Sequence, residues 1–187
     1  MSARGRGFSE RHPCGRENNM RNSTLSYLER DGAYLMLHRV KKKNDVNHDK
    51  WIGVGGGFEE GESPEDCMRR EAYEETGLRL GEISYRGLVT FVCYTDTAMT
   101  TEHMHVFTSS DFTGSTDFTG DPCDEGVLEW VPKTELESLP IWEGDRVFLR
   151  LLAADAPFFT LKLVYHGDTL TEVRLNDKPY PLRSGKV

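Results

Sequence analysis

The 187-residue chain lacks a long apolar run, a paired-cysteine motif and an excess of positive charge. No stretch approaches the roughly 20 apolar residues that a membrane-spanning helix needs, and no apolar segment follows the first arginines. We therefore expect no membrane span and no signal peptide. The formal net charge is -8, which argues against a general nucleic-acid binder, because such proteins need a positive field to displace the counterions around phosphates. No stable nucleic-acid complex is expected.

Cysteine is also scarce: Cys14, Cys67, Cys93 and Cys123 are too far apart for a C-x-x-C pair or a zinc site. The spacing favours separate reduced thiols in a soluble, cytoplasmic protein. Hydrophobic residues make up 37% and charged residues 29%, as in ordinary globular proteins. The length suits a single domain that buries its core without disulfides. Nothing in the sequence indicates the oligomeric state.

The first residues differ in composition from the rest of the chain. Residues 1–21 carry five arginines among small and polar residues, with no apolar period: Arg4, Arg6, Arg11, Arg16 and Arg21. Such composition is typical of a disordered basic tail. We expect a single folded domain over residues 22–187, and Met20 is an alternative start that one sequence cannot test.

Apolar and polar residues alternate in short runs through most of this domain, a pattern that predicts β-strands. Asp31-Gly32 separates the first two runs and predicts a hairpin. One late segment, 146–154, has helical periodicity instead. An α+β sandwich is therefore the expected fold class. The predicted strands cover residues 24–29, 33–39, 51–54, 83–94, 103–109, 127–131, 158–165 and 170–175.

A second helix is predicted from its end signals. Ser63 can accept hydrogen bonds from the first backbone N–H groups, Pro64 has the backbone angle of a first turn, and Asp66 faces the positive end of the helix dipole. Gly77 is a typical C-terminal stop. The helix is expected over residues 64–76.

The glycine-rich segment 53–57 precedes this helix, and two common phosphate-binding motifs are absent from it. A Walker loop would end in Gly-Lys-Ser/Thr, which does not follow these glycines. A dinucleotide fingerprint would need glycine where Phe58 stands. The glycines permit backbone angles that other residues resist, so they allow close approach to a ligand.

Glutamates crowd one side of the predicted helix. At 100° per residue, Glu71, Glu74 and Glu75 share a face, and Glu62 can fold back toward it. Each pair at about 4 Å repels by roughly 4 kcal/mol at an effective dielectric near 20. Solvation, raised pKa values or bound cations can offset this repulsion, and a solvated acidic face is common in helices. Oxygen-rich clusters suit Mg²⁺ or Mn²⁺.

The wider pattern is more specific than the glutamates alone. It matches G-x5-E-x7-R-E-U-x-E-E-x-G-U, where U is apolar, with a small alanine at the first U. Seven positions demand one residue type, so a chance match has a probability on the order of 10⁻⁹ per starting point. The chain thus resembles the Nudix hydrolase superfamily. The matching residues are Gly56, Glu62, Arg70, Glu71, Ala72, Glu74, Glu75, Gly77 and Leu78.

This resemblance implies a fold, a cofactor and a reaction. The implied fold is a Nudix-type α/β/α sandwich with a mixed central sheet. The implied metal ligands are the carboxylates of Glu71, Glu74 and Glu75 and the carbonyl of Gly56, with Mg²⁺ as the cofactor and Mn²⁺ as an alternative. The implied reaction is in-line hydrolysis of a diphosphate linkage by a metal-activated water.

Catalytic roles are implied for Glu62, Arg70, Glu71 and Glu74. Arg70 can orient Glu62 through charge-assisted hydrogen bonds. A carboxylate of the cluster accepts the proton of the attacking water.

Further segments are similar to MutT-type 8-oxo-dGTP diphosphatases: 51–56, 123–125 before Trp130, and 141–145. The likeness implies Glu125 as an additional metal ligand, Trp142 as a stacking surface for a purine, and Asp145 as a hydrogen-bond partner of the base edge. The alternatives are an acidic turn for Glu125, a core tryptophan and a helix-capping aspartate. The implied substrate is a purine nucleoside triphosphate, oxidised or not.

Two residues depart from that subgroup. Gly57 stands where a lysine is common, and Arg39 or Lys41 is the candidate replacement as a phosphate contact. Ile52 stands where some purine-reading relatives have asparagine, and isoleucine cannot hydrogen-bond a base. Both departures weaken selectivity for 8-oxoguanine more than nucleotide hydrolysis itself.

Other nucleotide substrates remain as alternatives: a dinucleoside polyphosphate, ADP-ribose or a triphosphorylated RNA 5′ end. Tyr94 is the one residue that favours a dinucleotide, and the arginine tail is the one segment that favours RNA. A non-catalytic nucleotide-binding regulator is the rival from another class. Such modules lose carboxylates of the motif, and this chain keeps them.

Overall fold

The structure is a computed structural model that describes residues 20–41, 47–118, 123 and 125–182. The predicted basic tail up to residue 19 lies outside the described residues. The tail was expected to end at residue 21, but its last two residues, Met20 and Arg21, belong to the first strand.

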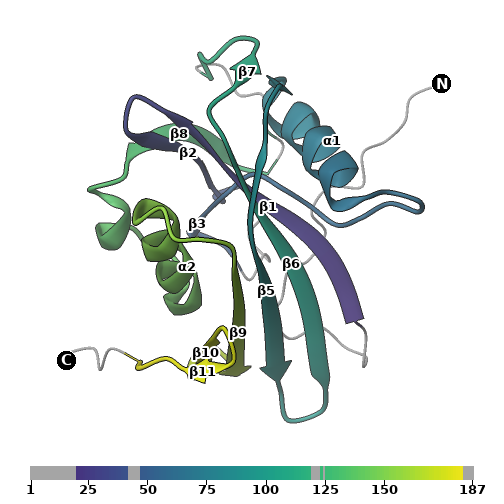
Figure 1. Ribbon diagram of the computed structural model, residues 1–187, viewed down its shortest axis with the longest axis vertical. Coiled ribbons are helices and arrows are strands. Elements are labelled where there is room, and N and C mark those ends of the chain that lie inside the picture. The colour runs from purple at the N-terminus through teal and green to yellow at the C-terminus, as the bar shows by residue number, and fades with distance from the viewer. Residues whose placement is uncertain (1–19, 42–46, 119–122, 124, 183–187) are drawn as a thin grey trace.

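A mixed sheet forms the centre of the molecule (Figure 1). Its order is β11-β10-β9-β5-β6-β1-β2-β3, and β8 pairs with β2 on the side of that path. β1 runs parallel to β6 and β5 runs parallel to β9, whereas the other pairs are antiparallel. The strands of this sheet are β1 (Met20–Arg30), β2 (Ala33–His38), β3 (Trp51–Ile52), β5 (Ser84–Tyr94), β6 (Met99–Ser109), β8 (Val127–Pro132), β9 (Phe159–His166), β10 (Thr169–Leu175) and β11 (Lys178–Pro179).

Two helices pack on opposite faces of the sheet (Figure 1). Helix α2 (Glu143–Ala153) buries Val147 and Phe148 in one hydrophobic cluster, and helix α1 (Pro64–Thr76) buries Met68 and Ala72 in the other. Alternate residues of β1 divide between the two clusters because successive side chains of a strand point to opposite faces. The expected sandwich with a mixed central sheet is confirmed.

The end signals of α1 act as the sequence predicts. The Ser63 hydroxyl accepts from the Asp66 N–H, and the Asp66 carboxylate accepts from the Ser63 N–H, which completes a capping box. Gly77 ends the helix with φ of 72°, in the left-handed region that glycine adopts at little cost. The helix has the predicted bounds because both ends depend on local chemistry.

The long predicted strands are all present, with ends that differ by a few residues. The Asp31-Gly32 hairpin is confirmed, and both residues have positive φ. Helix α2 begins at Glu143, three residues before the predicted start, and its N-cap Trp142 makes no side-chain cap hydrogen bond. Elements of two or three residues were not predicted, because so short a segment shows no periodicity. They are β4 (Arg79–Leu80), β7 (Phe112–Thr113), β11 and the 3-10 helix η1 (Leu136–Ser138).

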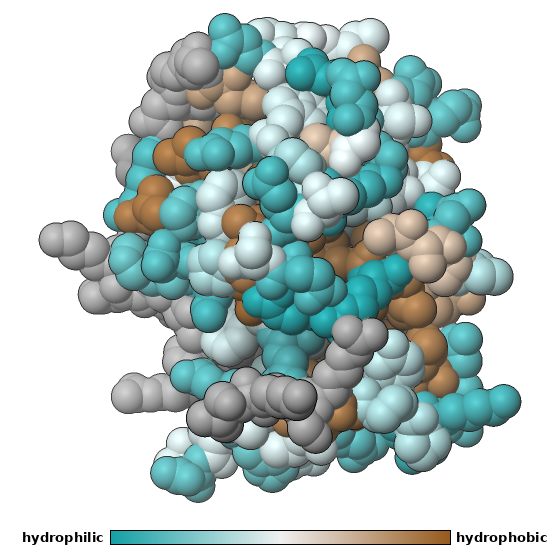
Figure 2. Space-filling model, turned by 90° about the vertical axis from the view of Figure 1, so that its left-hand side faces the viewer, coloured by the Kyte–Doolittle hydropathy of each residue, from teal (hydrophilic) through white to brown (hydrophobic). Residues whose placement is uncertain are grey.

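The cysteine expectation holds only in part. Cys67 and Cys123 are free and buried, as expected. Cys93 is disulfide-bonded, so the expectation of a reduced thiol is wrong for it, and Cys14 lies outside the described residues. No helix in the described parts is long and apolar enough to cross a membrane. On the face shown in Figure 2, hydrophobic side chains lie in small groups between hydrophilic ones.

Replacing Ser63 with alanine tests how far the capping box stabilises α1. We expect Ser63→Ala to lower the free energy of unfolding by about 1 kcal/mol, because the Asp66 N–H loses its acceptor. Chemical denaturation measures the change. Ser84→Ala, at an exposed position at the start of β5, is the control. Equal losses in both variants would show that the cap contributes nothing specific.

Candidate active site

The glycine loop before α1 lies directly against the acidic face of the helix. The Gly55 N–H donates to Glu75 Oε2 at 3.0 Å. A Cβ built on Gly56 would lie 2.0 Å from Glu71 Oε1, so the Glu71 carboxylate occupies the space that a side chain would need. The loop is held in place by β1, since the Thr24 N–H donates to the Gly56 carbonyl at 2.8 Å. Glycine is therefore required at position 56 for carbonyl and carboxylate to meet.

Arg70 connects three glutamates of this face. Its guanidinium makes a bidentate pair with Glu62, with N–O distances of 2.6 and 2.9 Å. It also donates to Glu71 Oε1 at 2.8 Å and to Glu74 Oε2 at 3.3 Å. Arg70 lowers the pKa of the Glu62 carboxyl, chiefly through these hydrogen bonds. The same partners raise the pKa of Arg70 itself, so the guanidinium offsets the repulsion among the carboxylates.

Cys67 packs against the glycine loop and is an unreactive, buried thiol. Its Sγ lies 3.4 Å from Thr24 Oγ1, and its thiol donates to the carbonyls of Gly57 at 3.5 Å and Gly56 at 3.7 Å. Burial raises the pKa of Cys67 to about 11. The group is a neutral thiol at ordinary pH, and it packs against the carbonyls instead of acting as a nucleophile.

The oxygen ligands suit a hard divalent cation. Glu71 is 8% exposed and lies against Gly56, and Glu75 reaches the same loop through Gly55. Within the described residues, no three acidic, histidine or cysteine side chains lie close enough together to hold a metal. Arg70 holds Glu71 and Glu74 instead. The carboxylate and carbonyl set fits Mg²⁺ or Mn²⁺, and binding would require these two side chains to turn from Arg70.

Glu125 and Arg39 form a buried pair beside this site. The Arg39 guanidinium donates to Glu125 Oε2, and the two residues are 1% and 5% exposed. Glu75 contributes to raising the pKa of the Cys123 thiol, so the loop that carries Glu125 lies near the acidic helix face. Lys41 Nζ donates to the Cys123 carbonyl at 2.6 Å. This placement favours Arg39 as a residue that orients Glu125 over a direct contact with phosphate.

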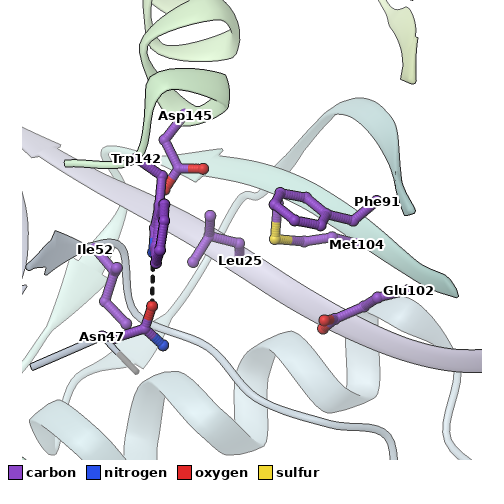
Figure 3. Close-up of a pocket in the computed structure, with 8 residues that line it drawn as sticks. All are labelled: Leu25, Asn47, Ile52, Phe91, Glu102, Met104, Trp142 and Asp145. Atoms are coloured by element: carbon purple, nitrogen blue, oxygen red, sulfur yellow. Dashed lines mark hydrogen bonds between the residues drawn. The ribbon is translucent and has the colours of Figure 1, made fainter. Parts of the chain in front are cut away.

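A pocket lies on the α2 face of the sheet (Figure 3). It contains both predicted base-binding residues, Trp142 and Asp145, and also Ile52. The Trp142 Nε1–H donates to Asn47 Oδ1 at 2.8 Å, and Lys50 Nζ lies 5.1 Å from the Trp142 ring centroid. The lining residues are Leu25, Asn47, Ile52, Phe91, Glu102, Met104, Trp142 and Asp145.

Asp145 is placed inside this pocket rather than at the surface. It is 7% exposed, and together with burial it raises the pKa of Tyr165, whose hydroxyl accepts from the Gly144 N–H at 2.8 Å. Trp142 meets Tyr165 edge to face, with ring centroids 6.1 Å apart. The tryptophan is thus partly packed in the core and partly presented to the pocket. The indole therefore has the core contacts of the alternative interpretation, and its role as a stacking surface for a purine stays a prediction.

Sequence reasoning missed five of the lining residues: Leu25, Asn47, Phe91, Glu102 and Met104. Four of them lie on strands with an ordinary alternating pattern, so nothing local distinguishes them from core residues. Asn47 lies in a polar loop that reveals no partner. Gly57, where the lysine is absent, has open space around a hypothetical Cβ. Packing does not therefore explain the glycine at that position.

Comparisons with known proteins agree with this geometry. A family model described as the NUDIX domain matches residues 21–152. The chain is 28% identical over 123 residues to the Bacillus subtilis protein named uncharacterized Nudix hydrolase YvcI, which covers 65% of this chain and 72% of that protein. It is 24% identical over 156 residues to a Danio rerio protein named oxidized purine nucleoside triphosphate hydrolase, covering 82% of this chain and 93% of the relative.

A solved structure shows the same fold. The MutT protein from Bacillus halodurans superposes with a TM-score of 0.74 at 23% identity, covering 85% of this chain and 99% of that one. The family model matches well over half of the chain, and the complete motif lies in the loop and helix that bring its residues together. The chain therefore belongs to the NUDIX domain family, as a pyrophosphohydrolase of the Nudix type.

Proposed function

We propose that this enzyme hydrolyses a purine nucleoside triphosphate, such as 8-oxo-dGTP, to the monophosphate and pyrophosphate with Mg²⁺, and so clears damaged nucleotides from the pool. The residues of the pocket support this substrate class, because an indole and a buried carboxylate, Trp142 and Asp145, line it together. The Danio rerio relative is named for oxidized purine triphosphates, which supports the same class.

The chemistry is assigned to the loop and α1. Glu71, Glu74, Glu75 and the Gly56 carbonyl would hold the cation, with Glu125 contributing from its loop. When bound, a divalent cation neutralises the diphosphate and lowers the pKa of a coordinated water. Arg70 keeps the Glu62 carboxylate ionised and oriented.

In the base pocket, Trp142 supplies a stacking surface and Asp145 an acceptor for the N–H groups of a purine edge. Asn47 fixes the indole plane through its hydrogen bond with Trp142. Ile52 adds apolar contact but cannot hydrogen-bond the base. Asp145 therefore contributes more to base selection than it would if an asparagine stood at position 52. Tyr94, which favours a dinucleotide substrate, stacks on His166 instead of lining this pocket.

Ranking substrates tests the proposed class. We expect a purine triphosphate to have the highest kcat/KM in a panel of 8-oxo-dGTP, dGTP, other nucleoside triphosphates, ADP-ribose and diadenosine polyphosphates, with Mg²⁺ or Mn²⁺. The products should be the monophosphate and pyrophosphate, as separated by ion-exchange chromatography. A clear preference for a dinucleotide or ADP-ribose would overturn the substrate class and leave the reaction class standing.

Glu74→Gln tests whether the acidic helix face performs the reaction. We expect kcat for the best triphosphate to fall by at least about 100-fold, because a carboxylate that serves metal binding or proton transfer is lost. Pyrophosphate release measures the rate. Glu65→Gln makes the same chemical change at an exposed position of the same helix and should keep the parent rate. Equal rates in both variants would show that the reaction does not depend on this helix face.

Two pocket variants separate stacking from base selection. Trp142→Ala should lower kcat/KM for every purine triphosphate by roughly ten-fold, because stacking is worth about 1–3 kcal/mol and tolerates any base. Asp145→Asn should change the ranking of guanine, 8-oxoguanine and adenine triphosphates, because the amide presents an NH2 donor group where the carboxylate only accepts. An unchanged ranking would remove Asp145 from base recognition.

A further inference from the structure

Glu102 brings a second carboxylate into the nucleoside pocket, at the end away from Trp142 and Asp145. Figure 3 shows Trp142 and Asp145 at one side of the pocket and Glu102 at the other, with Leu25 between them. Glu102 lies on β6 in register with Phe91 on β5, which also lines the pocket. The pocket therefore has an acidic group at each end of an apolar slot.

The Glu102 side chain is held in a defined position. Ser23, which is 2% exposed, donates its hydroxyl to Glu102 Oε1 at 2.5 Å. A carboxylate has about four acceptor positions, so this hydrogen bond orients the group and leaves it able to accept from a ligand. Ser23 lies in strand β1, so its hydroxyl holds the Glu102 side chain in place before a ligand binds. Less side-chain entropy of Glu102 is therefore lost on binding.

Ser23 also places Glu102 close to the metal end of the site. Ser23 pairs with Gly57 in a β-bridge, and Gly57 directly follows the proposed metal ligand Gly56. The Phe58 N–H donates to the Asn22 carbonyl at 3.2 Å, which continues this pairing. The pocket end at Glu102 thus lies between the base-binding residues and the loop that would meet the phosphates.

The chemistry of a carboxylate decides which part of a nucleotide can lie beside Glu102. A carboxylate accepts hydrogen bonds and repels phosphate, so the ligand group there must be an uncharged donor. The base is assigned to Trp142 and Asp145, and the phosphates to the metal loop. The sugar is the part that connects the two, and its hydroxyls are donors that a carboxylate binds well, as acidic residues do with ribose in dinucleotide-binding sites.

We propose that Glu102, oriented by Ser23, is a sugar-binding residue that makes this enzyme favour ribonucleotides over 2′-deoxyribonucleotides. The inference rests on the proposed nucleotide function and adds selection at the sugar to selection at the base. A ribose presents vicinal 2′- and 3′-hydroxyls to the carboxylate, and a 2′-deoxyribose presents one. Oxidised ribonucleoside triphosphates are then substrates of the same site.

The test compares matched nucleotide pairs with the full-length enzyme. GTP is measured against 2′-dGTP and 3′-dGTP, and 8-oxo-GTP against 8-oxo-dGTP, each as kcat/KM with Mg²⁺. We expect the parent enzyme to favour each ribonucleotide by about ten-fold, the size of one hydrogen bond to a charged group. Glu102→Met removes the acceptor at similar volume and should bring the ratio close to one.

Further variants separate the role of the charge from a general effect on the pocket. Glu102→Gln keeps the shape and the Ser23 bond and should give an intermediate ratio, and Ser23→Ala should reduce the ratio with Glu102 intact. Glu129→Gln, at an exposed position on β8, is the control and should keep the parent ratio. The preference between guanine and adenine should stay unchanged in all of these variants.

The outcomes distinguish this inference from the proposed function. If nucleoside triphosphates are hydrolysed and the ribo-to-deoxy ratio is near one in the parent enzyme, or is the same in Glu102→Met, the sugar-binding role is wrong and the proposed function stands. If Glu102→Met changes base preference instead, Glu102 belongs to base recognition and the inference also fails. If no nucleoside triphosphate is hydrolysed, the proposed function fails and the sugar subsite fails with it.

Discussion

The active-site end of this protein depends on one guanidinium among carboxylates. Arg70 donates to Glu62, Glu71 and Glu74, and also to the Gly57 carbonyl at 3.1 Å. Without this cation, the acidic helix face would repel itself and would lack a link to the glycine loop. The same contacts place the carboxylates beside the loop, where a metal can compete for them. The site is therefore neutralised by the protein and still available to a cation.

Close packing of loop against helix adds a second constraint. The carboxylate of Glu71 fills the space beside Gly56, and the Gly55 N–H binds Glu75, so loop and helix form one unit. The buried Cys67 thiol and the Thr24 N–H hold the Gly56 carbonyl from the other sides. Because each partner is backbone or a short side chain, little freedom remains in the placement of this carbonyl. Rigid placement of this kind is what phosphate chemistry with metals requires.

The pocket on the α2 face differs from the glycine loop and α1, because its residues come from several segments far apart in the chain. Its residues come from β1, β5, β6, the β2–β3 loop, β3 and the start of α2. Strand β1 connects the two regions: Leu25 lines the pocket, and Ser23 and Thr24 pair with the glycine loop. The residues proposed to contact base, sugar and phosphates are thus connected through a single strand. A shift of β1 would change all three together.

The sequence by itself determined the elements and residues that rest on local chemistry: α1 with both its ends, the long strands, the Asp31-Gly32 turn and the complete acidic motif. These follow from capping, periodicity and helical spacing, which act over a few residues. Only the tertiary structure decided that Arg39 is buried against Glu125 and that Glu102 enters the pocket. Both depend on strand pairings between segments far apart in the chain, and alternation along a strand does not reveal which strand lies beside it.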